Sequence, residues 1–284
     1  MTITEMAAYM QQRLSEIYDK EEASAIVKWA LQEALALDAL QLQLQKQKLL
    51  TEEQERHLAK ITERLCRYEP VQYVFQRAYF MGMKLMVTPA TLIPRPETEE
   101  LVQWIVENCG INFDGRILDI GTGSGCIAIA LKRALPKAQL YACDVCENAL
   151  YVANQNALEQ NTKIEFFRCD ILNEMPPHTG FDLVVSNPPY IPLDEKESLH
   201  PNLTLYEPHL ALFTPATSPM IFYEHIASYC SEGLLSDKGT VYVEAHFQRA
   251  REVADTFVKK GFSNLDIKTD IQGKARMVKA SFKP

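Results

Sequence analysis

One stretch of the sequence constrains the fold more than any other, because an apolar run, a glycine-rich turn and a helix-like segment follow one another directly. The apolar run covers residues 116–120, the turn residues 121–125 and the helix-like segment residues 126–135. Glycines let the backbone of such a turn approach a ligand, and the helix that follows offers N–H groups without partners inside the helix. The stretch therefore predicts a strand, a ligand-binding turn and a helix of an α/β fold.

The spacing of the turn narrows the kind of ligand. Gly121, Gly123 and Gly125 alternate with Thr122 and Ser124, which gives the pattern G-x-G-x-G. Dinucleotide-binding turns follow G-x-G-x-x-G instead. The difference argues against NAD as the ligand.

Two further apolar runs end in an acid. Asp144 closes the run at residues 138–143, 19 residues after Gly125, a distance at which an acid can accept both ribose hydroxyls of a nucleoside. Asp170 and Ile171 close the run at residues 164–169, where an acid and an apolar neighbour can meet an adenine amine and ring. Each acid alone is more often a helix cap or a turn residue. Three successive strand ends with ligand-type groups favour a crevice at the carboxyl edge of a parallel sheet.

A fourth apolar run, residues 181–186, leads into Asn187, Pro188, Pro189 and Tyr190. These residues are suited to hold a planar NH2 group, whose nitrogen is a poor nucleophile because its lone pair is delocalised. The Asn187 side-chain oxygen and the Pro188 carbonyl oxygen can accept hydrogen bonds from the two N–H groups of such an NH2 group. Tyr190 offers an aromatic face for packing. Asn-Pro and Pro-Pro also form ordinary turns. The glycine turn upstream favours the functional interpretation.

With these motifs the chain resembles the class I S-adenosylmethionine-dependent methyltransferases, and within them the PrmC/HemK release-factor glutamine methyltransferases. Residues 92–99 resemble the signature of that family between its two domains. Further agreement is found at Tyr206, Glu207, Pro208, Ala211, Leu212, Asp270, Gly273 and Arg276. Two positions depart from the family pattern: Gln76 stands near a usual glycine, and Ala245-His246 replaces Ile-Gly after Glu244.

The resemblance implies an activity and a set of site residues. The enzyme would transfer a methyl group from S-adenosylmethionine, leaving S-adenosylhomocysteine, to the side-chain nitrogen of the glutamine in the Gly-Gly-Gln motif of peptide chain release factors. Its implied cofactor contacts are Gly121, Thr122, Gly123, Ser124, Gly125, Asp144, Asp170, Ile171 and Asn187. The implied catalytic and substrate-binding residues are Asn187, Pro188, Pro189 and Tyr190.

Two other functions remain open. The same handling of an NH2 group fits adenine N6 or cytosine N4, so a nucleic-acid amino-methyltransferase is the leading alternative, and such an enzyme would flip its base into the pocket. A cofactor-binding adapter without catalysis is the other, and residues 187–190 argue against it. The net charge of −8 gives no support for nucleic-acid binding, so release factors are the expected partners and direct contact with nucleic acid is not expected.

Composition divides the chain into domains. Residues 1–69 contain neither glycine nor proline and are rich in Ala, Leu, Glu and Gln, which predicts a helical bundle. We expect an N-terminal helical domain over residues 1–72, to which the resemblance gives a role in substrate recognition. A hairpin and linker over residues 73–98 and a catalytic domain over residues 99–284 would follow. The catalytic domain is predicted as an α/β, Rossmann-like, mostly parallel sheet with one antiparallel strand among the last two, residues 264–270 and 275–282.

The remaining expectations concern location, metals and one long connection. The sequence has neither a membrane-length apolar run nor a basic, apolar secretory start, so we expect a cytoplasmic protein that does not bind membranes. The seven cysteines are scattered, and no second pair matches Cys143 and Cys146 at zinc-site spacing, so no metal is expected. The proline-rich connection over residues 191–219 follows the Asn187 motif and is expected to be a wall or lid on the substrate side.

Overall fold

The computed structural model describes residues 1–282, and the chain divides into two compact units. The first comprises residues 1–76 together with residues 200–206, and the second comprises residues 77–199 and the chain from Glu207 onward. Each unit has a hydrophobic core of its own.

The first unit is a small helical bundle, as its composition predicts. Its helices are α1 (Ile3–Leu14), α2 (Lys20–Leu35), α3 (Ala39–Leu44), α4 (Glu52–Leu65), α5 (Val71–Phe75) and α9 (Pro201–Tyr206). The side chains of Thr2, Asp19, Asp38 and Thr51 accept backbone N–H groups at the starts of the first four helices. Such N-caps satisfy donors that the helix leaves free, so the starts of these helices are set by local sequence.

The segment that includes α9 is part of this bundle although it comes from the middle of the chain. The ring of His200 stacks on Tyr18 with centroids 5.4 Å apart, and it meets Tyr68 edge-on at 5.6 Å. The Tyr206 hydroxyl donates a hydrogen bond of 2.8 Å to the backbone oxygen of Arg67. Part of the predicted wall or lid is thus a component of the helical unit.

The second unit is built on a seven-stranded sheet in the order β10-β11-β9-β6-β3-β4-β5. Its strands are β3 (Arg116–Ile120), β4 (Gln139–Asp144), β5 (Ile164–Arg168), β6 (Phe181–Ser186), β9 (Leu235–Glu244), β10 (Asn264–Thr269) and β11 (Ala275–Ser281). Only β11 runs against the others, since it pairs antiparallel with both β9 and β10 while the remaining pairs are parallel. The predicted α/β class with one antiparallel strand is confirmed.

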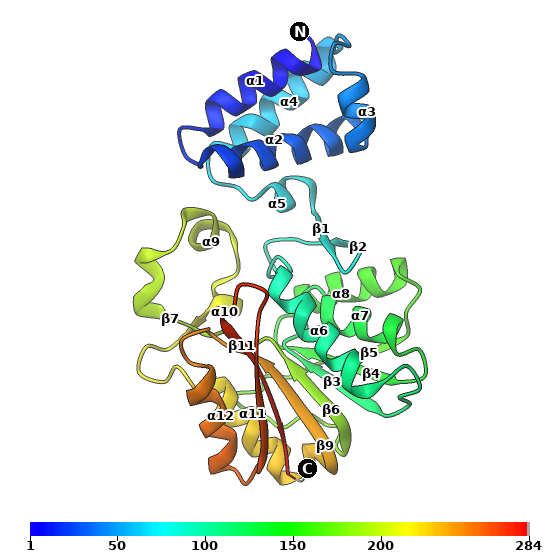
Figure 1. Ribbon diagram of the computed structural model, residues 1–284, viewed down its shortest axis with the longest axis vertical. Helices are drawn as coiled ribbons and strands as arrows, with labels where there is room; N and C mark the ends of the chain where they lie inside the picture. The colour runs from blue at the N-terminus through cyan, green and yellow to red at the C-terminus, as the bar shows by residue number, and fades with distance from the viewer. Residues whose placement is uncertain (283–284) are drawn as a thin grey trace. The chain divides into compact units, whose positions relative to one another are not determined.

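Helices cover both faces of the sheet (Figure 1). Helices α6 (Pro96–Cys109), α7 (Cys126–Ala134) and α8 (Glu147–Glu159) pack on one face, and α11 (Ile221–Tyr229) and α12 (Ala250–Lys259) on the other. Successive side chains of β3 point to opposite faces of the sheet. Ile117 packs in the core that α6, α7 and α8 cover, and Leu118 packs in the core that α11 and α12 cover. Burial on both faces explains why the central strands are continuously apolar in sequence.

The predicted hairpin is formed by β1 (Arg77–Phe80) and β2 (Met83–Met86), which pair antiparallel. The side chain of Asn156 fixes the hairpin to α8, because it accepts from Met86 N at 2.6 Å and donates to Met86 O at 2.9 Å. The connection after residue 190 also contains secondary structure. Its remaining short elements are β7 (Ile191–Pro192), η1 (Leu193–Ser198), α10 (His209–Leu212) and β8 (Phe213–Thr214). A π-helical turn, η2 (Cys230–Leu234), leads from α11 into β9.

Candidate active site

The glycine turn after β3 leaves open space where side chains would otherwise be. Gly121 and Gly123 have φ angles of 72° and 56°, in the left-handed region that favours glycine. A Cβ atom added to either would meet no atom within 4 Å, whereas one added to Gly125 would lie 3.2 Å from the Cβ of Ala153. The first two glycines therefore border an open cavity, and the third allows α7 to pack against α8.

Asp144, at the end of β4, fixes the glycine turn from the neighbouring strand. One carboxylate oxygen accepts from Gly123 N at 2.9 Å and the other accepts from Cys146 N at 2.9 Å. Burial raises the pKa of this carboxyl, and the two backbone N–H groups oppose that shift. Each carboxylate oxygen has a further acceptor position, so Asp144 can still bind two hydroxyl groups of a ligand.

Asp119, within β3, was not predicted from the sequence as a site residue. It is fully buried, and one of its oxygens accepts both the Thr122 hydroxyl at 2.6 Å and the Ala128 N–H at 3.2 Å. Burial raises the pKa of this carboxyl to about 7, against the effect of those two hydrogen bonds. Asp119 thus holds the glycine turn to the first turn of α7.

Asp170 and Ile171 lie together after β5, as the sequence predicts. The two carboxylate oxygens of Asp170 accept from the backbone N–H of Leu172 at 3.1 Å and the side-chain amide of Asn173 at 2.7 Å. Asp170 therefore stabilises a turn, which is the common role of such an acid in sequence. It also lines the pocket described below. The Ile171 side chain is buried.

Asn187 follows directly after β6. The neighbouring Ser186 hydroxyl donates to Ile120 O at 2.7 Å and ties the ends of β6 and β3 together. The side-chain amide of Asn187 donates through Nδ2 to the Thr98 hydroxyl at 3.1 Å. No donor to Asn187 Oδ1 is found among residues 1–282, so this oxygen is available to a ligand.

Behind Asn187 lies a buried carboxyl group, Glu244 at the end of β9. It accepts hydrogen bonds from the Thr98 hydroxyl at 2.7 Å and the Tyr190 hydroxyl at 3.3 Å. Burial raises the pKa of Glu244 to about 7, while these two hydrogen bonds and the charge of Arg276 oppose the rise. The Tyr190 hydroxyl therefore points to Glu244, and a role for its ring against a substrate stays a prediction.

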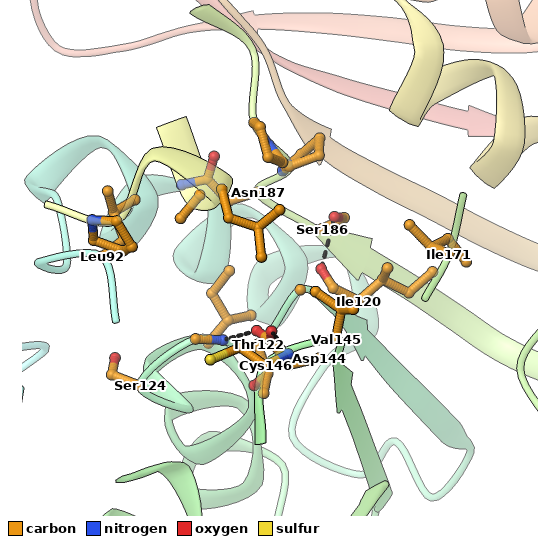
Figure 2. Close-up of a pocket in the computed structure, with 18 of the residues that line it drawn as sticks. Leu92, Ile120, Thr122, Ser124, Asp144, Val145, Cys146, Ile171, Ser186 and Asn187 are labelled. Atoms are coloured by element: carbon orange, nitrogen blue, oxygen red, sulfur yellow. Dashed lines mark hydrogen bonds between the residues drawn. The ribbon is translucent and has the colours of Figure 1, made fainter. Parts of the chain in front are cut away.

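A pocket of about 590 Å³ lies at the carboxyl ends of β3, β4, β5 and β6, and Asp119 and Glu244 lie behind its lining residues. The lining residues predicted from the sequence are Gly121, Thr122, Gly123, Ser124, Asp144, Asp170, Ile171, Asn187, Pro188 and Pro189. Gly125 and Tyr190 are not among the lining residues. Figure 2 shows Leu92 and Ile171 on opposite sides of the pocket, with Asn187 between them.

Several other lining residues were not predicted from the sequence as site residues. Leu92, Pro94 and Arg95 come from the linker, and Phe222 and Ile226 come from α11. The linker signature was a local signal that could have identified the first three. The two α11 residues have the ordinary spacing of a buried helix face, so only the packing of α11 on the sheet brings them to the pocket.

The connection after the Asn187 motif also borders the pocket, through Pro208, Leu210 and Ala211. Its position is fixed by Glu207, whose buried carboxylate accepts from the Ile93 backbone N–H at 3.1 Å and pairs with the Arg95 guanidinium. This part of residues 191–219 is a wall of the pocket.

The residues of the pocket fit S-adenosylmethionine. Open space in front of Gly121 and Gly123 allows a ligand to approach the backbone, and Asp144 has free acceptor positions for ribose hydroxyls. The cavity volume lies in the range of small-molecule sites. Within residues 1–282, no group of three or more His, Cys, Asp or Glu side chains is placed to hold a metal ion, and no helix is both long and apolar enough to cross a membrane.

The sheet and the pocket at its carboxyl edge define a class I methyltransferase, whose cofactor is S-adenosylmethionine. Residues 97–202 match the Methyltransferase small domain family, and residues 5–75 match the PrmC N-terminal domain family. A solved methyltransferase from Pyrococcus furiosus has a TM-score of 0.52, covering 80% of this chain and 98% of its own at 16% identity. At that identity the likeness supports the fold alone.

Two curated relatives identify the family more closely. A release factor glutamine methyltransferase from Flavobacterium psychrophilum is 37% identical over 100% of both chains. One from Bacteroides thetaiotaomicron is 38% identical over 97% of this chain and 99% of its own. The chain belongs to the release factor glutamine methyltransferase family.

Proposed function

We propose that this protein transfers a methyl group from S-adenosylmethionine to the side-chain amide nitrogen of the glutamine in the Gly-Gly-Gln motif of peptide chain release factors. The observation that carries the proposal is the orientation of Asn187. Its NH2 group donates to Thr98, so its carbonyl oxygen is left for a substrate donor at the pocket. Membership of the family supports glutamine as that substrate.

The residues of this chain act by positioning the substrate. Asn187 Oδ1 and the Pro188 carbonyl oxygen accept hydrogen bonds from the two N–H groups of the glutamine side chain. These hydrogen bonds orient the glutamine nitrogen and stabilise the positive charge that develops on it. When bound, S-adenosylmethionine supplies an electrophilic methyl group. Asp144 would hold the ribose hydroxyls, Gly121 to Ser124 would border the cofactor, and Ile171 would pack against its adenine ring.

We also propose that residues 1–72 form a domain that recognises the protein substrate, followed by the hairpin and linker over residues 73–98 and the catalytic domain from residue 99. The match of residues 5–75 to the PrmC N-terminal domain family supports this division. Because release factors act in translation, we propose the cytoplasm as the location of the enzyme.

The test is transfer of labelled methyl from S-adenosylmethionine to purified release factors, with a Gln→Ala release factor as the control. We expect label only where the Gly-Gly-Gln glutamine is present. Label in the Gln→Ala control would contradict the proposed site of methylation. Label in DNA or RNA, and none in release factors, would identify the enzyme as an amino-methyltransferase of nucleic acids.

A further inference from the structure

Three side chains form a continuous hydrogen-bonded chain behind the proposed catalytic amide. Asn187 Nδ2 donates to Thr98 Oγ1 at 3.1 Å, and Thr98 Oγ1 donates to Glu244 Oε2 at 2.7 Å. Thr98 and Glu244 are 2% and 1% exposed, so water does not compete for these bonds. The three residues come from the loop after β6, the first turn of α6 and the end of β9.

The two hydrogen bonds have a donor-to-acceptor direction, from Asn187 through Thr98 to Glu244, and this direction decides which end of the Asn187 amide faces the pocket. A side-chain amide has nearly the same shape in its two flipped orientations, so packing alone does not distinguish them. The Thr98 hydroxyl carries one hydrogen, and it gives that hydrogen to Glu244. Thr98 must then accept from Asn187, which places NH2 toward Thr98 and the carbonyl oxygen toward the pocket.

We propose that Thr98 and ionised Glu244 are positioning residues that keep the Asn187 carbonyl oxygen toward the substrate, and that protonation of Glu244 reverses the chain. The proposal rests on the proposed function, in which that oxygen accepts a substrate N–H. A proton on Glu244 is donated to Thr98 Oγ1, which lies closer than the Tyr190 hydroxyl, at 2.7 Å against 3.3 Å. The Thr98 hydroxyl then donates to Asn187, whose amide flips and presents NH2 to the NH2 of the substrate.

The surroundings of Glu244 make this proton exchange accessible near neutral pH. The groups that face it are Thr98 and Glu97 of α6, Cys126 of α7, Tyr190 after β6, and Arg276 of β11. Tyr223 of α11 donates to its backbone oxygen at 2.9 Å. Burial disfavours the ionised carboxylate and so does the charge of Glu97, whereas the hydrogen bonds from Thr98 and Tyr190 and the charge of Arg276 favour it. The balance puts the pKa of Glu244 at about 7.

A first experiment tests Thr98 through turnover. Thr98→Val keeps the shape of the side chain and removes the hydroxyl, so we expect kcat to fall about a hundredfold with an unchanged Kd for S-adenosylmethionine. Thr98→Ser restores the hydroxyl and should recover most of kcat. Thr256→Val is the matched control, because it removes a hydroxyl that donates only to Glu252 O on α12, at 3.0 Å. A kcat for Thr98→Val within about twofold of the control would overturn the proposal.

A second experiment observes the Asn187 amide without any substrate. The side-chain amide resonance of Asn187, assigned by its loss in Asn187→Ala, is followed in 15N-labelled protein from pH 5 to pH 9. We expect a transition with a midpoint near the Glu244 pKa of about 7, and no transition in Glu244→Gln, whose amide does not titrate in this range. A wild-type resonance that does not shift, or a transition that persists in Glu244→Gln, would overturn the proposal. Failure of the wild-type enzyme to label release factors would instead contradict the proposed function, and the resonance would still test the positioning chain.

Discussion

The carboxylate of Glu207 pairs with the guanidinium of Arg95, although the two residues lie 112 positions apart in the sequence. The same carboxylate accepts the backbone N–H of Ile93, and the Glu207 side chain is only 2% exposed. One buried acid therefore fixes both the linker and the segment after α9, which form neighbouring parts of the pocket wall.

Replacement of Glu207 should lower the stability of the protein. Glu207→Ala leaves a partly buried cation and a backbone N–H without their partner, so we expect a loss of about 3 kcal/mol in the free energy of unfolding. Urea denaturation measures the loss. Arg95→Met combined with Glu207→Ala should cost less than the sum of the two single changes, and strict additivity would show that the pair is not coupled.

Asn187→Ala should remove methyl transfer while it leaves cofactor binding largely intact. The substitution removes an acceptor for the substrate N–H, and we expect kcat to fall by about 100- to 1000-fold. Single-turnover transfer of labelled methyl gives the rate, and calorimetry gives the Kd for S-adenosylmethionine. Turnover near that of the wild type would exclude Asn187 from catalysis.

Asp144→Asn should weaken cofactor binding rather than slow methyl transfer. Replacing the carboxylate removes the charge that strengthens its hydrogen bonds to hydroxyl groups, at a cost of about 1.5–3 kcal/mol in binding free energy. It also places an NH2 group against the N–H of Gly123 or Cys146, which loosens the cofactor-binding turn further. We expect a corresponding increase in the Kd for S-adenosylmethionine, with kcat at saturating cofactor close to that of the wild type. An unchanged Kd would remove Asp144 from the cofactor site.

Asp119 should make the protein less stable as pH rises toward neutrality. Its pKa is raised from 3.8 to about 7 in the folded state, so the folded protein holds this proton more tightly than the unfolded chain does. The contribution of Asp119 to the free energy of unfolding therefore falls as pH rises from about 4 to 7, by about 2 kcal/mol between pH 5.5 and pH 8.

Asp119→Asn tests that dependence. The variant can keep both hydrogen bonds from Thr122 and Ala128 because a single Asp119 oxygen accepts them. We expect the difference in stability between pH 5.5 and pH 8 to shrink in Asp119→Asn. It should stay the same in Asp237→Asn, which changes an exposed acid. An equal difference in the wild type and Asp119→Asn would contradict the assignment.

Gln76→Gly should stabilise the protein. Gln76 ends α5 with φ 53° and ψ 40°, a left-handed conformation that costs a residue with a Cβ more than it costs glycine. After the entropy that glycine adds to the unfolded chain, we expect a net gain of about 0.5–1 kcal/mol. Gln76→Ala keeps the conformational cost and should give no gain. Chemical denaturation of the two variants decides the point, and a loss of stability in Gln76→Gly would refute it.

Much of the pocket could be predicted from the sequence because its groups lie at strand ends. An apolar run predicts a strand, and a glycine or an acid directly after it must lie at the carboxyl edge when the strands are parallel. That reasoning brought Gly121, Asp144, Ile171 and Asn187 to one pocket, where the structure places them. The glycine that the family usually has near Gln76 also has a local cause, since the backbone there is left-handed, whereas nothing in the structure explains its replacement by Gln76.

The groups behind the pocket could not be predicted in this way. Thr98 and Glu244 are 146 positions apart, and neither has a local pattern that indicates the other. Their contact depends on where α6 packs against β9, which follows from the order of strands in the whole sheet. Sequence periodicity gives the faces of helices and strands, but not which buried polar groups meet between them.

The helical unit is made of two separate segments of the chain, and this has a consequence for synthesis of the protein on the ribosome. Because residues 200–206 belong to that unit, the chain passes between the two units three times, after residues 76, 199 and 206. The first 76 residues leave the ribosome long before α9, the last helix of this unit, is made. The N-terminal bundle is therefore completed only after Tyr206 has emerged. At that point four of the seven strands of the large sheet have been made, and β9, β10 and β11 have not. Completion of the bundle thus falls within the synthesis of the second unit.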